Sequence, residues 1–144
     1  RVIALAAALV VALALAACTG PYQDLPKAEG EALQSQLGGQ VEGLLAGLAA
    51  GDYAGFSKDF GAEMKSGMTE TSLAELRGML ETKVGAYQGY RFVKAQSAGE
   101  FTRMVYEAQF SGDDKVSVVV VHGQEGGAWK VTGLWFDSAK LRQK

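Results

Sequence analysis

Apolar positions in the first half of the chain recur at helical spacing. Within residues 27–50 they follow one another at steps of three or four, at Leu33, Leu37, Val41, Leu44 and Leu48. This spacing places all five on one face of a helix, which is typical of a face packed against a core. Gly51 follows this run, and we expect it to end the helix because glycine readily adopts the left-handed conformation of a helix C-terminus.

Small residues form a second stripe on the same predicted helix. It consists of Gly39, Gly43, Gly47 and Gly51, flanked by Ala46 and Ala50. At about 100° per residue this stripe lies well away from the leucine face. An interior glycine costs about 1 kcal/mol relative to alanine, so the stripe suggests a packing purpose. Two interpretations stay open, a smooth side of a soluble helix and a dimer contact, while Gln40 and Glu42 argue against a bilayer.

Two more helical stretches are predicted before the period changes. Asp52 is a suitable cap for the first, whose apolar residues are Tyr53, Phe56, Phe60, Met64 and Met68. This stripe predicts a core face rather than a cofactor site. The second has capping-box spacing between Ser72 and Glu75, with Thr69 and Thr71 as alternative caps. Its predicted buried face consists of Leu73, Leu76, Leu80 and Val84, and Gly85 is placed to stop it.

From Tyr87 onward the apolar period is two, which indicates strands. Four strands are predicted, over residues 90–95, 101–111, 116–122 and 128–136. Turn residues at 112–114 and 124–127 are short enough to make these hairpins antiparallel. Helices followed by strands, without alternation, predict an α+β fold in which the helices pack on a four-stranded antiparallel sheet.

The turn lengths also predict which side chains share a face of this sheet. A three-residue turn places Phe110 opposite Val116, and a four-residue turn then places Val116 opposite Trp135. We assign to the helix side of the sheet Tyr90, Tyr106, His122, Trp129 and Trp135. The other face carries polar residues together with Val105, Val119 and Val121. A slip of one residue would exchange the two faces.

An apolar leader precedes these elements. The sixteen residues after Arg1 are only Val, Ile, Ala and Leu, and Cys18 follows them directly, in the sequence Leu15-Ala16-Ala17-Cys18. This run is shorter than the roughly 20 residues that span a bilayer, but it suits the core of a secretory signal peptide. Its end resembles the bacterial lipobox, which implies that Cys18 becomes N-terminal and carries acyl chains such as palmitate. The alternative is an ordinary signal peptide with a chance cysteine.

These features predict the organisation and location of the protein. Residues 1–17 would be a lipoprotein signal peptide, 18–27 the lipidated cysteine with a disordered tether, 28–137 a single α+β domain and 138–144 a C-terminal tail. Lipidation would hold the domain at the cell membrane or the outer membrane, outside the cytoplasm. The membrane is therefore one predicted partner.

Composition excludes several classes of function. A net charge of −2 lacks the basic excess of a nucleic-acid binder. One cysteine excludes an internal disulfide, and with one histidine it excludes the usual zinc sites. Asp113-Asp114 lacks the further oxygen ligands of a calcium loop. No metal or cofactor is predicted.

Three segments carry a resemblance to a known family. They are GDYAGFSKDF at residues 51–60, Met64-Lys65 with Met68-Thr69-Glu70, and VTGLWF at residues 131–136. Over residues 33–136 the chain resembles a domain-of-unknown-function family of secreted and lipid-anchored bacterial and archaeal proteins. The resemblance implies the cone-shaped fold of nuclear transport factor two, a helical layer on a curved antiparallel sheet. It implies no activity, so no functional residue is carried over.

Candidate chemistry comes from the predicted helix side of the sheet. Related cone-fold isomerases, dehydratases and polyketide cyclases use an aspartate or histidine base inside the cone, whereas the face proposed here has His122 and no acid. Asp59 or Glu63, predicted on a helix, are the acids that could reach it. The favoured hypothesis is therefore a non-catalytic module that binds a small molecule or an envelope protein, and the alternative is a small cone-fold enzyme. Tyr90, Trp129 and Trp135 would line an open pocket; a filled one would leave the face around Val119 for binding.

Overall fold

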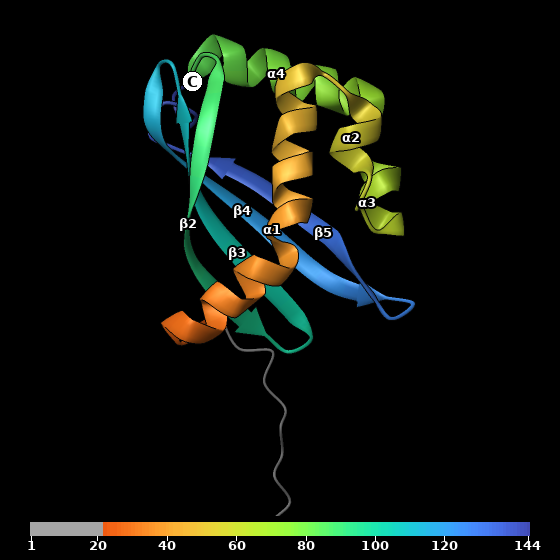
Figure 1. The fold of residues 1–144 in the computed structure, drawn as a ribbon. Coiled ribbons are helices and arrows are strands. Elements are labelled where there is room, and N and C mark those ends of the chain that lie inside the picture. Colours follow the sequence, from red (N-terminus) through yellow and green to blue (C-terminus); the bar gives the residue numbers. More distant parts are fainter. Residues whose placement is uncertain (1–21) are drawn as a thin grey trace, which may run out of the picture.

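The computed structural model describes residues 22–144, which form four helices and one sheet. The helices are α1 (Lys27–Ala50), α2 (Tyr53–Ser57), α3 (Ala62–Gly67) and α4 (Glu70–Lys83). The strands are β1 (Gln23–Asp24), β2 (Tyr87–Ala98), β3 (Phe101–Phe110), β4 (Asp113–Glu125) and β5 (Ala128–Asp137). They lie in this order and every neighbouring pair is antiparallel. Figure 1 shows α1 crossing one face of the twisted sheet and α4 crossing one end of α1.

The α+β class is confirmed, but the described sheet has five strands rather than four. The additional strand is Gln23–Asp24, which pairs with Gln96 and Ser97 of β2. The sequence predicts these two residues in a disordered tether, because the four residues between Pro21 and Pro26 are too few to show the alternation of a strand. Backbone pairing, reinforced by the Leu25 amide donating to the Ala95 carbonyl at 3.0 Å, fixes this segment instead.

Helix α1 has the predicted bounds and the predicted buried face. Leu37, Val41, Leu44 and Leu48 are buried, and Gly51 ends the helix in the left-handed conformation with φ 69°. The small-residue stripe divides into two parts. A side chain at Gly47 would collide with the backbone nitrogen of Phe56, whereas Gly39 and Gly43 face open space. The packing purpose of the stripe is thus the close approach of α2 at Gly47.

The aromatic stripe after Asp52 does not form one continuous helix. The chain leaves helical structure between α2 and α3, where Phe60 forms a parallel bridge with Val131 of β5. The Val131 amide donates to the Asp59 carbonyl at 2.8 Å, and the Gly61 amide donates to the Val131 carbonyl at 2.9 Å. Pairing with the edge of β5 therefore replaces one helical turn, while Phe60 keeps its predicted burial.

Helix α4 begins at one of the alternative caps. The Ser72 amide donates to Thr69 Oγ1 at 3.3 Å, and the Thr69 amide donates to Ser72 Oγ at 3.1 Å, so the capping box joins these two residues. The predicted box between Ser72 and Glu75 does not form. Gly85 has φ 88°, and its amide donates to the Leu80 carbonyl, as expected for the residue that stops a helix.

The β3–β4 hairpin has a shorter turn than predicted. Its turn is Ser111-Gly112, so Ala108 rather than Phe110 lies opposite Val116. This correction shifts the register by two residues. Because side chains alternate with period two, an even shift leaves each side chain on its predicted face. Tyr106 and His122 accordingly face the helices.

The β4–β5 hairpin differs in a way that changes faces. Val121 lies opposite Gly133 but His122 lies opposite Val131, which leaves Thr132 as an extra residue in β5. Such a β-bulge breaks strict alternation. Trp135 therefore lies opposite Val119 on the outer face and not opposite Val116 on the inner face, so its predicted position was wrong. The Thr132 hydroxyl donates to the Val121 carbonyl at 3.3 Å within the bulge.

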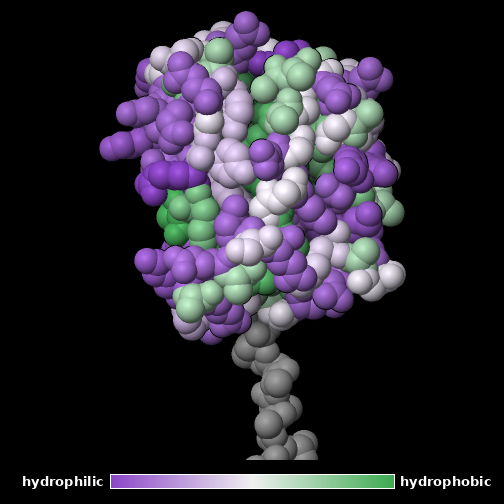
Figure 2. Space-filling view, viewed as in Figure 1, coloured by the Kyte–Doolittle hydropathy of each residue, from purple (hydrophilic) through white to green (hydrophobic). Residues whose placement is uncertain are grey.

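The core lies between α1 and the inner face of the sheet. Leucines of α1 pack with Phe56 and Phe60, and the sheet contributes Met104, Tyr106, Val118, Val120 and Val131. On the helix side of the molecule, hydrophilic side chains cover most of the visible surface and hydrophobic areas are scattered between them (Figure 2). The predicted C-terminal tail also contacts the domain, since Lys83 Nζ donates to the Leu141 carbonyl at 3.1 Å.

Candidate functional site

The inner face of the sheet is filled by packed side chains. Tyr106 is 1% exposed, and its hydroxyl donates to Gln34 Oε1 at 2.6 Å. Its ring packs edge-on against Tyr90 and Phe92, with centroids 5.5 and 5.8 Å apart. Burial raises the pKa of Tyr106 far above its ordinary value. The Tyr106 hydroxyl is thus committed to the core.

His122 is enclosed in the same interior. Gln40 Nε2 donates to the Trp129 carbonyl at 2.9 Å, so Gln40 Oε1 is left to accept from His122 Nδ1, 3.1 Å away. This arrangement assigns the proton to Nδ1 and leaves Nε2 without a partner among the described residues. Burial lowers the pKa of His122 to about 4, so the ring is neutral at pH 7.

The residues that the sequence predicts to line one pocket therefore do not lie together. Tyr106 and His122 are buried, while Tyr90 and Trp129 are partly buried and pack against the core. Trp135 is 58% exposed on the opposite face. Of the two acids considered as partners of His122, Glu63 is exposed on α3, and among residues 22–144 neither its carboxylate nor that of Asp59 forms a hydrogen bond with the imidazole.

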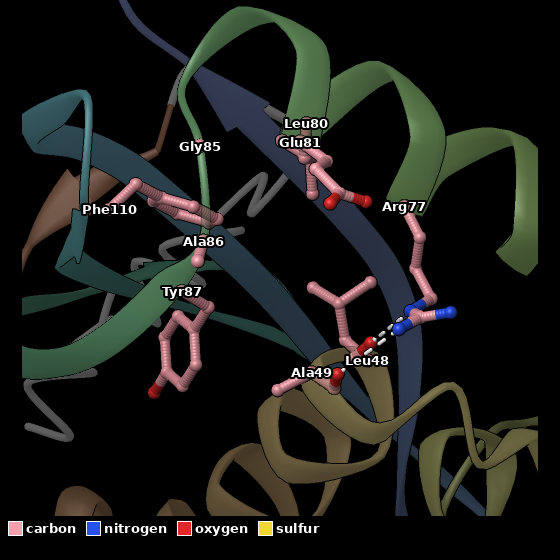
Figure 3. A pocket seen from close by; sticks show the side chains of 9 residues that line it. All are labelled: Leu48, Ala49, Arg77, Leu80, Glu81, Gly85, Ala86, Tyr87 and Phe110. Carbon is pink, nitrogen blue, oxygen red and sulfur yellow. Dashed lines mark hydrogen bonds between the residues drawn. The ribbon is translucent and has the colours of Figure 1, made fainter.

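A crevice of about 180 Å³ lies where α4 passes the end of α1 (Figure 3). Arg77 Nε donates to the Leu48 carbonyl at 2.8 Å, and Nη2 donates to the Ala49 carbonyl at 3.2 Å. Both carbonyls lie in the last turn of α1, where the Gly51 amide also donates to the Leu48 carbonyl at 3.3 Å, and a cation there complements the helix dipole. Burial raises the pKa of Tyr87 to about 12. Arg77 thus caps the end of α1, and Tyr87 packs edge-on against Phe110 with ring centroids 5.7 Å apart.

A larger groove, of about 370 Å³, lies on the outer face of the sheet. We call it the outer groove. It is bounded by the start of β3, the end of β4, the middle and second half of β5 at Thr132 and Trp135, and α3. Its aromatic side chains are Tyr22, Phe101 and Trp135, and its carboxylates are Glu63, Glu100 and Glu125.

Glycines shape the floor of the outer groove. A Cβ atom at Gly133 would lie 2.6 Å from the Trp135 ring, and one at Gly123 would lie 3.0 Å from the Phe101 ring. Both rings therefore lie directly over backbone that has no side chain. The bulge at Thr132 is what brings Trp135 to this face. The outer groove depends on a local irregularity of β5 together with these two glycines.

The outer groove has an acidic lining. Three glutamates line it, and none of its lining residues is Lys or Arg. Glu125 Oε2 accepts from the Ala62 amide at 3.2 Å, which ties this carboxylate to the start of α3. Beside the groove, the Arg103 guanidinium lies 5.2 Å from the centroid of the Tyr22 ring. Aromatic faces and negative charge thus occur together in one concave surface.

Only part of this site is predictable from the sequence. Val119 and Val121 were noted as an apolar area on the outer face, and Val121 does line the groove. No hydrophobic period predicts that Tyr22, Glu100 and Phe101 line the groove, because the groove joins segments that are distant in the sequence. One signal was available, since an isolated glycine inside a strand, here Gly133, indicates a bulge or a close approach of backbone.

Comparison with protein-family models, curated proteins and solved structures finds no match to this chain. Within residues 22–144, no three His, Cys, Asp or Glu side chains gather closely enough to hold a metal ion. No helix of this part of the chain combines the length and the apolar character needed to cross a membrane. Cys18 lies outside the described residues.

Proposed function

We propose that this protein is a non-catalytic binding module whose binding surface is the outer groove. The observation that carries the proposal is the contrast between a filled inner face and an outer face with Trp135 58% and Phe101 40% exposed. Aromatic side chains are enriched at binding surfaces because they supply a large contact area with little loss of conformational freedom. A groove of about 370 Å³ also has the size of a ligand site.

The alternative of a small cone-fold enzyme needs a reactive group that a substrate can reach. A general base must lie within hydrogen-bond distance of the proton that it abstracts. His122 is 0% exposed and its Nδ1 is engaged by Gln40, which favours binding over catalysis. Turnover of isomerase, dehydratase or hydrolase substrates by the purified protein, lost in His122→Ala, would contradict the proposal.

We further propose that the module belongs to the lipid-anchored family that its sequence resembles and that it has that family's cone fold. Helices packed on one face of a twisted antiparallel sheet support the fold, and the Leu-Ala-Ala-Cys motif supports an anchor at Cys18. Such an anchor would place the groove at the cell envelope, outside the cytoplasm. Cell fractionation tests it: Cys18→Ser should move the protein out of the membrane fraction, and equal retention would contradict the anchor.

Photo-crosslinking tests the choice of surface. A benzophenone side chain at Phe101, in the outer groove, is compared with one at Met79 on α4, since both positions are 40% exposed. We expect a discrete adduct in cells at position 101 that disappears when Trp135→Ala is added, and none at position 79. Adducts of equal yield at both positions, or no adduct at position 101, would contradict the proposal.

A further inference from the structure

The charge of the outer groove indicates the charge of the ligand that it can bind. Glu63, Glu100 and Glu125 come from three separate segments, α3, the β2–β3 turn and the end of β4, and all three are exposed. Carboxylates that line one concave surface repel an anion and attract a cation. The positive charge of Arg103, which lies over Tyr22 beside the groove, offsets one of these three negative charges, so an excess of carboxylates remains. The chemistry therefore favours a positively charged occupant.

The aromatic side chains specify the kind of cation. A guanidinium group is planar, and it stacks on aromatic faces while its N–H groups donate to carboxylates. The molecule already contains this contact, because the Arg103 guanidinium lies 5.2 Å from the Tyr22 ring centroid. Trp135 and Phe101 offer two more aromatic rings in the same groove, and both are substantially exposed.

The dimensions and the floor of the groove suit a long side chain. A volume of about 370 Å³ accommodates a few side chains rather than a folded domain. Val121 and Gly123 supply an apolar floor against which the methylene groups of an arginine can pack. The carboxylates at the rim would meet the charged end of the same side chain.

From these features we infer that the outer groove binds an arginine-bearing peptide segment of a protein partner, with the guanidinium between Trp135 and the glutamates. This inference rests on the proposed function and adds the chemical class of the ligand. It predicts that affinity depends on the charge of the groove as well as on its aromatic area, and that salt weakens binding.

Nuclear magnetic resonance of the full chain tests this inference with defined peptides. The probe is acetyl-Gly-Arg-Gly-Arg-Gly-amide, compared with the same peptide containing Lys, Gln or Glu and with free arginine. The chain has two tryptophans, so their indole signals report on two places. We expect the arginine peptide to shift the Trp135 indole and not that of Trp129, with at least tenfold weaker binding for the Gln peptide and for free arginine.

Charge-neutral variants supply the matched control. Glu63→Gln, Glu100→Gln and Glu125→Gln together should weaken binding of the arginine peptide at least tenfold. The same three substitutions at the exposed Glu29, Glu70 and Glu75, outside the groove, should change the affinity less than twofold. Equal weakening by both triple variants would overturn the inference, because it would indicate attraction by net charge alone.

The two proposals can fail separately. If the Gln or Glu peptide binds as well as the arginine peptide and still shifts the Trp135 indole, the charge inference is wrong and the groove remains a binding surface. If crosslinking at Phe101 succeeds while the arginine peptide shifts neither indole, the inference is overturned alone. If crosslinking gives no adduct at Phe101 and the arginine peptide shifts neither indole, both proposals are contradicted.

Discussion

The two faces of the sheet differ in how far their aromatic and polar side chains are exposed. On the inner face, Tyr106 and His122 are buried and each is hydrogen-bonded to a glutamine of α1. On the outer face, Trp135 and Phe101 lie over glycines and remain substantially exposed. The inner face is therefore committed to packing in the core, where the Tyr106 hydroxyl and His122 Nδ1 have partners and His122 Nε2 has none among the described residues. The outer face keeps apolar area exposed.

One residue decides on which face Trp135 lies. With strict alternation, Trp135 would share the face of Trp129 and Val131, and the outer groove would lose its largest ring. The extra residue Thr132 reverses the alternation, so that Leu134 and Phe136 pack against the core in its place. A β-bulge near a functional surface commonly redirects a side chain in this way.

Among the substitutions considered, Tyr106→Ala on the inner face should cause the largest loss of stability. Removing this buried ring should lower the free energy of unfolding by about 3–5 kcal/mol, because it leaves a cavity between Tyr90, Phe92 and α1. Urea denaturation measures the change. Tyr106→Phe is the control, which should cost only about 1 kcal/mol since it removes the hydrogen bond to Gln34 alone. An unchanged urea midpoint for Tyr106→Ala would place the ring outside the core.

Acid should weaken the same face through His122, the only histidine of the chain. Its pKa in the folded protein is about 4, below the ordinary value of 6.5, so the unfolded state binds more protons between these values. Stability is therefore complete above pH 6.5 and falls as the pH decreases, by about 2 kcal/mol between pH 7 and pH 5.

Urea denaturation of the wild type and His122→Leu across this range checks the acid effect. The variant should lose most of the pH dependence between pH 7 and pH 5, because it has no imidazole to protonate. A wild-type unfolding free energy that is constant over the range would show that His122 is accessible and titrates normally.

Two glycine substitutions in α1 test how closely α2 approaches this helix. Gly47→Ala should destabilise by about 1–3 kcal/mol because the new methyl group collides with the backbone of α2. Gly43→Ala meets nothing within 4 Å and should stabilise by up to about 1 kcal/mol through better helix propensity. Thermal unfolding measures both changes. Effects of the same sign would show that α2 does not approach α1 at Gly47.

Local sequence patterns predicted the elements well where packing and hydrogen bonding agree. Helix α1 has the predicted bounds because its leucine spacing, its glycine stop and its tertiary packing favour the same structure. The predictions were wrong where hydrogen bonds to a distant strand prevail. The segment at Phe60 pairs with Val131, and Gln23–Asp24 pairs with β2.

The candidate site was less predictable than the fold. Periodicity identified Val121 on the outer face, but it assigned Trp135 to the wrong face because the pairing of β4 with β5, and not the β5 pattern, creates the bulge. Glu100 and Tyr22 join the groove only through the antiparallel order of β1, β2 and β3. Contacts between segments that are distant in the sequence cannot be predicted from the local spacing of hydrophobic residues.

Trp135 lies on an open outer face while Trp129 packs toward the core, and the fluorescence of the two tryptophans tests this difference. Trp129→Phe leaves Trp135 as the only emitter, and Trp135→Phe leaves Trp129. We expect acrylamide to quench Trp135 several-fold more efficiently than Trp129, with Trp135 emitting at the longer wavelength. Equal quenching of both, or stronger quenching of Trp129, would contradict the bulged register and with it the outer groove.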